Sequence, residues 1–206
     1  MHDSSREERR KRVAQEAAEL LYSQQEKEYR QSKLRAAKNL SVNILPSNAE
    51  IADELDRIAE EKEGKSRKKR LVQMRREALQ IMKALEDFSP VLVGSVWRGT
   101  IHHSSDIDIS TLARNPKKIV QSLEKHGYGI TETREKTVVK KGEKQKSFHV
   151  QVMLPSYSQA EIVVRNPDDI THQARCEIYG DKITGLTTQK LNRLMKQDPH
   201  RKFVPT

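Results

Sequence analysis

The sequence predicts an α+β protein, in which a small mixed β-sheet has helices packed on one face and follows a helical N-terminal region. Two observations support this. The first 45 residues lack Gly and Pro and are rich in residues that favour helices. From residue 91 onward, short apolar or alternating runs recur between turn residues, which is typical of strands. We therefore predict a helical region over residues 1–70 and a second domain over residues 71–206.

The N-terminal region is predicted to begin with one long helix, from about Ser5 to Lys38. Its surface is charged with both signs, which is common on solvated helices, so we favour a helix docked along the core. An arm that binds nucleic acid or a second subunit is the alternative. One apolar stripe would face the core, formed by Val13, Ala17, Leu20, Leu21, Ala36 and Leu40.

Pro46 separates this helix from a second one, which Ser47 or Asn48 caps and which runs through Glu60. We predict a charged loop over residues 60–70, with Gly64 as its hinge. A third helix would then run to Phe88, before Ser89–Pro90. Its apolar positions recur at helical spacing and indicate core packing: Leu71, Met74, Ala78, Ile81, Met82 and Leu85.

The stretch from residue 91 to residue 109 carries the candidate chemistry. Val91–Val93 reads as a buried strand that breaks at Gly94–Ser95, a pair that permits a tight turn and leaves N–H groups and a hydroxyl free. Asp106–Ile109 alternates, so both carboxylates would lie on one face of a strand. Two such carboxylates repel each other unless a cation is present, and oxygen ligands select hard ions such as Mg²⁺.

This pattern resembles the motif of the DNA polymerase β-like nucleotidyltransferase superfamily. Gly94–Ser95, ten intervening residues and then Asp106-Ile107-Asp108 carry the resemblance, which covers roughly residues 75–165 and is most similar to archaeal CCA-adding enzymes, poly(A) polymerases and minimal nucleotidyltransferases. It implies that Gly94 and Ser95 bind the β- and γ-phosphates of a nucleoside triphosphate, with ATP favoured. It also implies that Asp106 and Asp108 hold two Mg²⁺ ions, or Mn²⁺ in their place.

The rest of the domain supplies a third candidate ligand. We predict a helix from Asn115–Pro116 to Gly127, a hairpin with strands over 128–140 and 148–154, a strand over 160–165 and a last helix over 186–195. The superfamily has a third metal-binding carboxylate on a strand after such a hairpin. Glu161 is the only acid in the 160–165 run and resembles that ligand, a strand-edge Glu facing water being the alternative. Arg98 is a candidate for nucleotide binding, as a guanidinium near the phosphates.

The resemblance implies transfer of a nucleoside monophosphate from a nucleoside triphosphate to a hydroxyl acceptor. One ion would lower the pKa of the acceptor hydroxyl, and the other would stabilise the leaving pyrophosphate. The net charge of +10 favours a polyanionic partner. We therefore expect an RNA 3′ end as acceptor, with a protein or small-molecule hydroxyl as alternatives. The candidate RNA-binding residues lie at the basic hairpin tip and are Lys140, Lys141, Lys144 and Lys146.

Two other classes stay open. One is an antitoxin-like nucleotidyltransferase that modifies (AMPylates) or masks a partner protein. The other is a non-catalytic nucleic-acid-binding protein of the same fold. Few residues follow Glu161, too few for the additional RNA-binding domains of CCA-adding enzymes and poly(A) polymerases. We therefore expect primer binding to fall to the N-terminal helices, the hairpin or another protein.

Composition also bounds the cellular setting. Cys176 is the only cysteine, which excludes an intrachain disulfide and favours a reducing compartment. The basic N-terminal run is not followed by an apolar core, and no window approaches the ~18 consecutive apolar residues of a membrane span. No Cys/His cluster has zinc-like spacing. We expect a soluble, cytoplasmic protein with no membrane partner.

Overall fold

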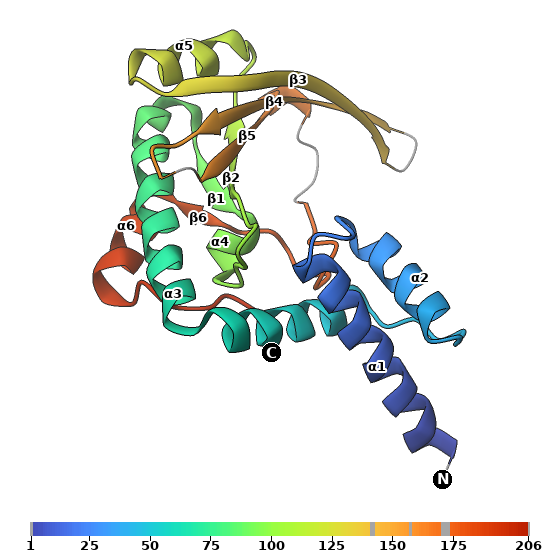
Figure 1. The fold of residues 1–206 in the computed structure, drawn as a ribbon. Helices are drawn as coiled ribbons and strands as arrows, with labels where there is room; N and C mark the ends of the chain where they lie inside the picture. The colour runs from blue at the N-terminus through green and yellow to red at the C-terminus, as the bar shows by residue number, and fades with distance from the viewer. Residues whose placement is uncertain (1, 141–142, 157, 170–173, 206) are drawn as a thin grey trace.

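The computed structural model describes residues 2–140, 143–156, 158–169 and 174–205. These residues form an α+β fold (Figure 1). Three helices come first, and the strands of a six-stranded mixed sheet then follow with helices between some of them. The fold class predicted from the sequence is confirmed. None of the helices in the described part of the chain combines the length and the apolarity that a membrane crossing needs.

The N-terminal region contains two helices where the sequence predicted one. α1 spans His2–Tyr22 and α2 spans Tyr29–Asn39. The chain reverses between them, with Gln24 in the left-handed region at φ 59°. The reversal lets the apolar residues of both helices pack together on a third helix, which a straight helix could not do. This cluster includes Val13, Ala17, Leu21, Ala36, Ile51 and Leu55.

The third helix, α3, spans Asn48–Ala84 and joins the second and third predicted helices. Of the two caps that the sequence offered, Ser47 is the one used, and it forms a capping box with Glu50. The predicted loop over residues 60–70 is wrong, because helix continues on both sides of Gly64. Only that residue is non-helical, at φ 49° and ψ −124°, a conformation that glycine reaches without steric cost. The kink turns α3 from the N-terminal helices onto the sheet (Figure 1).

The sheet has the strand order β3-β4-β5-β2-β1-β6. The strands are β1 Val91–Val93, β2 Ile107–Leu112, β3 Gly129–Lys140, β4 Glu143–Met153, β5 Gln159–Arg165 and β6 Leu186–Thr187. β2 and β5 pair in parallel, and the other neighbours are antiparallel. The two-residue strand β6 was not predicted, since Leu186 and Thr187 were assigned to the last helix.

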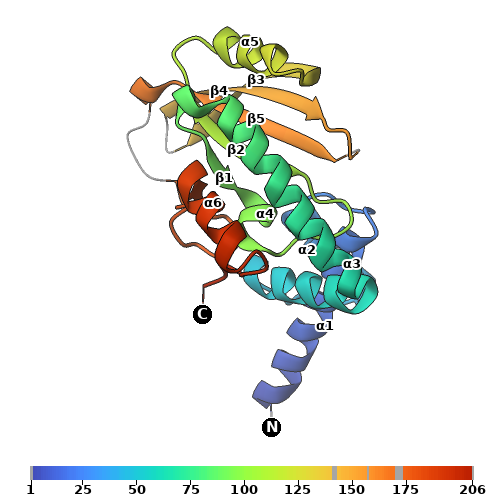
Figure 2. The same ribbon diagram turned by 90° about the vertical axis from the view of Figure 1, so that its left-hand side faces the viewer.

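Three helices cover one face of the sheet (Figure 2). These are the second half of α3, α5 (Lys117–Lys125) and α6 (Thr188–Gln197), while the short α4 (Gly94–Arg98) follows β1 directly. Alternate strand residues face these helices and are buried, among them Ile107, Ile109, Val150, Ala160 and Ile162. The residues between them therefore lie on the opposite face, which is free of these helices. That opposite face carries the candidate site.

Two hydrophobic clusters divide the chain. The first lies among α1, α2 and the start of α3 and reaches Ile58, whereas the second begins at Leu71 and fills the space under the sheet. The same helix contributes to both, on either side of the kink at Gly64. The division into domains at residues 70 and 71 stays a prediction, because one continuous α3 crosses that boundary.

Candidate functional site

Three carboxylates lie together on the open face of the sheet. Asp108 is in β2 and is the register partner of Glu161 in the parallel strand β5, so the two side chains are neighbours on one face. Asp106 precedes β2 by one residue and lies two residues before Asp108. Ile107 lies between the two aspartates and Ile109 follows Asp108, and both isoleucines are fully buried on the opposite face. The structure thus brings together the three acids that the sequence singled out.

Crowding of these acids changes their protonation. Burial raises the pKa of Asp108 to about 8, and the charges of Asp106 and Glu161 add to the increase. Burial also raises the pKa of Asp106, and the charge of Glu161 contributes to that shift. A cation placed among these groups would favour their ionised forms, because it would offset both burial and mutual repulsion.

Glu161 is held in a different way. Burial alone would raise its pKa, but hydrogen bonds from His149 and Arg134 outweigh burial and hold the pKa below its usual range. Its Oε1 accepts hydrogen bonds from Arg134 at 3.1 Å, His149 Nδ1 at 3.0 Å and Gln151 Nε2 at 2.9 Å. The donors come from β3 and β4, on the side of β5 away from β2. Glu161 is therefore ionised and anchored by its neighbours.

Gly94 fits against Asp108 because it has no side chain. It follows Val93, which pairs with Asp108 across β1 and β2. A Cβ atom at Gly94 would lie 2.0 Å from Asp108 Oδ2, and its φ of +70° is a value that other residues rarely adopt. Close approach and backbone conformation both require glycine here. Ser95, the next residue, is half-buried at the start of α4.

The short helix α4 is fixed from below by a buried arginine. Arg75 of α3 is fully buried and donates to the carbonyl oxygens of Val96 at 3.1 Å and Trp97 at 2.9 Å. It also donates to the carbonyls of Pro199 and Arg201 in the C-terminal segment. Burial lowers its pKa to about 10, so it remains charged at neutral pH. One guanidinium thus ties α3, α4 and the C-terminal segment together.

Arg98, which the sequence assigned to nucleotide binding, is buried beside the C-terminal segment. Its guanidinium lies 4.4 Å from the Trp97 ring centroid and 4.8 Å from that of Tyr179. It donates to Asp181 Oδ1 at 2.7 Å and to the Phe203 carbonyl at 2.8 Å. These contacts give Arg98 a packing role at the end of α4. Its assignment to nucleotide binding stays a prediction, and none of these contacts involves Asp106, Asp108 or Glu161.

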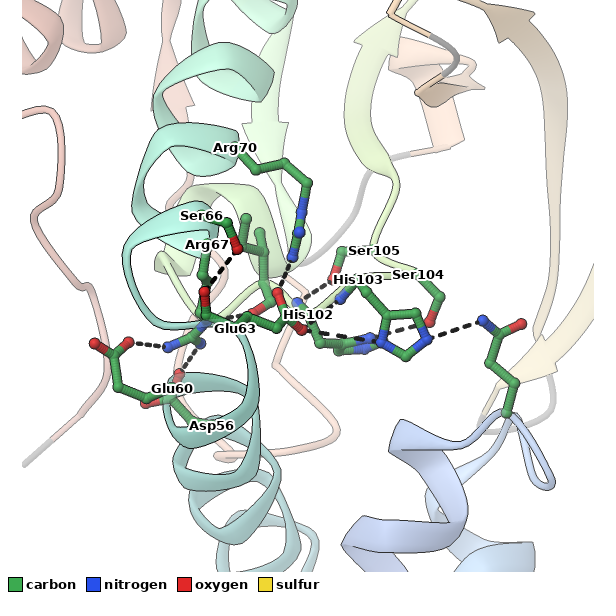
Figure 3. Close-up of polar contacts among 12 residues, drawn as sticks. Asp56, Glu60, Glu63, Ser66, Arg67, Arg70, His102, His103, Ser104 and Ser105 are labelled. Carbon is green, nitrogen blue, oxygen red and sulfur yellow. Dashed lines mark hydrogen bonds and ion pairs between the residues drawn. The ribbon is translucent and has the colours of Figure 1, made fainter.

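The loop between α4 and β2 is held by the kinked part of α3 (Figure 3). Arg67 donates to the carbonyl of Ile101 at 2.7 Å and pairs with Asp56 and Glu60. Glu63, the residue before the kink, accepts a hydrogen bond from the backbone N–H of His103 at 2.8 Å and pairs with Arg70. The loop that leads to Asp106 is thereby attached to the helical region.

α1 reaches the same loop through its last turn. The rings of Tyr22 and His103 meet edge to face at 4.6 Å, and Gln24 Nε2 lies 3.3 Å from His103 Nε2. Burial lowers the pKa of His102 to about 4, so its imidazole is neutral at neutral pH. The partners of His103 could not be identified from the sequence, because Glu63 and Gln24 look like ordinary charged and polar surface residues.

The basic hairpin is described only in part. Lys141 and the side chains of Lys140 and Lys144 lie outside the described residues. Lys146 is exposed, but strand alternation places it with Phe148 and Val150 on the face opposite Glu161. Among the hairpin side chains that the structure describes, the cations on the carboxylate face are Arg134 and Lys136 of β3, whose register partners are His149 and Ser147. Neither residue was predicted from the sequence, although the alternation of Phe148 and Val150 indicates which face of the hairpin is apolar.

The fit of a metal ion can be judged from the donor set. Within the described part of the chain, no group of three or more His, Cys, Asp or Glu side chains surrounds one position as ligands would. Glu161 is engaged with β3 and β4 through its Oε1. The donors of Asp106 and Asp108 are oxygens only, which suits a hard divalent ion. Burial, with the charges of neighbouring acids behind it, raises the pKa of both groups, and a bound cation would oppose that shift.

Comparison with known families agrees with the motif. Residues 75–171 match the family model described as nucleotidyltransferase domain, a little under half of the chain. The match includes Gly94, Ser95, Asp106, Asp108 and Glu161, and it agrees with the superfamily that the sequence motif indicates. No curated protein matches the chain.

Several solved structures resemble this one at low identity. Cid1 poly(U) polymerase bound to MgATP has 16% identity, with 46% of this chain and 32% of that chain covered, at a TM-score of 0.33. Cid1 with its short product ApU has 14% identity, 57% and 36% coverage and a TM-score of 0.35. The GLD-2/RNP-8 complex has 13% identity, 60% and 44% coverage and a TM-score of 0.34. This chain therefore spans 32–44% of the length of these relatives.

The close approach of Gly94 to Asp108 gives a stability prediction. Gly94→Ala should lower the free energy of unfolding by more than the ~1–3 kcal/mol expected for backbone strain alone, because the new methyl group also displaces Asp108. Gly127→Ala is the matched control, since Gly127 has a φ of +81° and no atom lies within 4 Å of the place its new methyl group would take. Denaturant unfolding of both variants gives the comparison. Equal losses would show that Asp108 yields to the methyl group without cost.

The pKa of Asp108 gives a pH prediction. A carboxyl group whose pKa is raised on folding binds its proton more tightly in the folded state, so its contribution to stability is present at low pH and is lost as pH rises from about 4 to 8. Without divalent ions, Asp108→Asn should therefore be more stable than the wild type at pH 8, and the difference should shrink toward pH 5.

Thermal melts across this pH range, with and without Mg²⁺, measure the effect. Mg²⁺ should stabilise the wild type at pH 8 and leave Asp108→Asn unchanged, because the variant lacks the charge that the ion would neutralise. A variant that is less stable than the wild type at every pH would mean that Asp108 has a structural role.

Proposed function

We propose that this chain is an enzyme that transfers a nucleoside monophosphate from a nucleoside triphosphate to a hydroxyl acceptor, which the match of residues 75–171 to a nucleotidyltransferase domain supports. The observation that carries the proposal is the meeting of Asp106, Asp108 and Glu161 on one sheet face, beside a glycine that touches Asp108. Buried acids gathered without a cation destabilise a fold, so such a cluster is retained for chemistry more readily than for packing.

The ions would be held by Asp106 and Asp108, with Glu161 as the third carboxylate. Bound Mg²⁺, or Mn²⁺ in its place, would supply activation of the acceptor hydroxyl and charge stabilisation of the leaving pyrophosphate. The chain's own contribution is the geometry. β2 and β5 fix the spacing of Asp108 and Glu161, and the loop fixed by α3 delivers Asp106 to the same face.

The triphosphate would bind beside Gly94 and Ser95. A side chain at Gly94 would fill the space next to the Asp108 carboxylate, and glycine leaves that space open. Ser95 offers a hydroxyl and a backbone N–H to the phosphates. Arg75 keeps α4 in place by binding two of its carbonyl oxygens, so the Gly94–Ser95 turn is supported from beneath. ATP is the nucleotide we propose. Arg98 would contribute through the packing of α4 and not by reaching the phosphates.

The acceptor we propose is an RNA 3′ end. The net charge of +10 suits a polyanion, and Arg134 and Lys136 lie on the same sheet face as the carboxylates. The β3–β4 hairpin also projects beyond the rest of the sheet, on the side of the molecule where α1 and α2 lie (Figure 1). A strand of RNA that approaches the carboxylates along this face would pass these two cations.

Transfer activity provides the direct test of the proposal. The protein is incubated with each labelled nucleoside triphosphate, Mg²⁺ and total RNA or cell lysate. Asp108→Asn should lower transfer by roughly 100-fold or more, because a lost metal ligand removes several kcal/mol of transition-state stabilisation. Asp168→Asn is the matched control, since Asp168 is exposed and pairs with Arg114 away from the site.

The outcomes separate the candidate functions. Label in RNA supports the proposal, whereas label in a protein would favour the antitoxin-like enzyme that modifies a partner. Transfer that is equal in the wild type and in Asp108→Asn would refute the site. Absence of transfer to every acceptor would favour a non-catalytic protein of the same fold.

The RNA-binding face is tested by two lysines of one hairpin. Lys136→Gln should weaken RNA binding and reduce the slope of log affinity against log salt by ~0.7, the value for one phosphate contact on a single strand. Lys146→Gln removes the same charge from the opposite face and should leave the slope unchanged. Filter binding across a salt series gives both slopes. Equal slopes for the two variants would show that RNA does not follow the carboxylate face.

A further inference from the structure

We propose that His149 is a positioning residue that, with Arg134 and Gln151, fixes one oxygen of Glu161 so that its second oxygen is turned toward Asp106 and Asp108. This inference rests on the proposed nucleotidyl transfer, because it gives Glu161 its place in the metal site. It concerns the three residues that surround Glu161, none of which belongs to the motif that identifies the domain.

The order of the strands shows on which side of Glu161 its hydrogen-bond donors lie. In the order β3-β4-β5-β2, Glu161 on β5 has β4 on one side and β2 on the other. All three donors to Oε1 come from the first side, Arg134 from β3 and His149 and Gln151 from β4. Asp108 is the register partner of Glu161 on the second side. Since the two oxygens of a carboxylate diverge, anchoring Oε1 toward β4 leaves the other oxygen for the side of the aspartates.

His149 is the most constrained of the three donors. Its side chain is 9% exposed, whereas that of Arg134 is 43% exposed. Both ring nitrogens have partners, because Nδ1 faces Glu161 at 3.0 Å and Nε2 lies 2.9 Å from the Ser147 hydroxyl. Because an ionised carboxylate only accepts hydrogen bonds, Glu161 selects the tautomer with Nδ1–H, and the Ser147 hydroxyl, which can donate or accept, then donates to Nε2.

Fixing Glu161 in advance matters because glutamate is flexible. A free Glu side chain has several rotatable bonds and loses rotamer entropy when it is ordered. In this site the three hydrogen bonds restrict it before any ion arrives, so an ion would meet a ligand already in place. Side chains that orient a metal ligand in this way typically change metal affinity or activity by ~10–100-fold when they are removed.

Mn²⁺ binding to the intact chain tests the proposal without relying on catalysis. Titration calorimetry with Mn²⁺ alone is run on the wild type, Asp108→Asn, His149→Ala and His149→Asn. We expect His149→Ala to bind Mn²⁺ ~10–100-fold more weakly than the wild type. His149→Asn should recover most of the affinity, because the asparagine amide nitrogen can donate from a position close to that of Nδ1.

Val150→Ala is the matched control. Val150 is the next residue of β4, is fully buried and faces the helices, so its truncation lowers stability without touching Glu161. Its Mn²⁺ affinity should equal that of the wild type. Should His149→Ala fail to fold, Gln151→Leu removes another donor to the same oxygen and is expected to weaken Mn²⁺ binding as well.

The outcomes separate this inference from the proposed function. Absence of Mn²⁺ binding in the wild type, or equal binding in the wild type and Asp108→Asn, would overturn both. Mn²⁺ binding that depends on Asp108 but is the same with and without the His149 or Gln151 donor would overturn only the positioning role. Equal weakening in His149→Ala and His149→Asn would also overturn it, since the hydrogen bond would then not be the cause.

Discussion

The repulsion among buried carboxylates is the constraint on which the rest of the site depends. Asp108 has its pKa raised to about 8 by burial and by its acidic neighbours, and Gly94 presses against it so closely that no side chain would fit between them. The sheet holds these groups together because the hydrophobic core beneath it is tightly packed. Alternate residues of β2 and β5 are fully buried beneath the site, so the strands that carry the acids cannot separate to relieve the repulsion.

The N-terminal helical region contributes to that rigidity. Arg67 is 2% exposed, and its guanidinium joins the Ile101 carbonyl to two acids of α3. Such a buried charge is tolerated only when its partners are in place, because an unpaired buried ion costs several kcal/mol. The kink at Gly64 brings Glu63 to the same loop, where it binds the backbone of His103. The helical region is thus part of the support of Asp106 and not a separate appendage.

Much of the fold and the centre of the site follow from local sequence patterns. The alternation around Asp108, the glycine at position 94 and the hairpin strands are short-range signals, and the structure has each of them in place. The break after Tyr22 and the continuous helix through Gly64 could not be read in this way, because both depend on which apolar surfaces meet in three dimensions. The same holds for the pairing of Glu63 with His103, which joins residues forty positions apart.

In the hairpin, the strands are confirmed, whereas the assignment of RNA binding to the lysines of its tip stays a prediction. The sequence placed RNA binding at the basic tip, since the lysines cluster there, but clustering along the chain does not decide which face of a strand a side chain occupies. Register does: Arg134 pairs with His149 and Lys136 with Ser147, whereas Lys146 falls on the helix-covered face. Because Arg134 and His149 also hold Glu161, the base of the hairpin belongs to the site itself. A shift of the hairpin against β5 by one residue would reverse every one of these contacts, so strand register is as much a part of the candidate chemistry as the acids are.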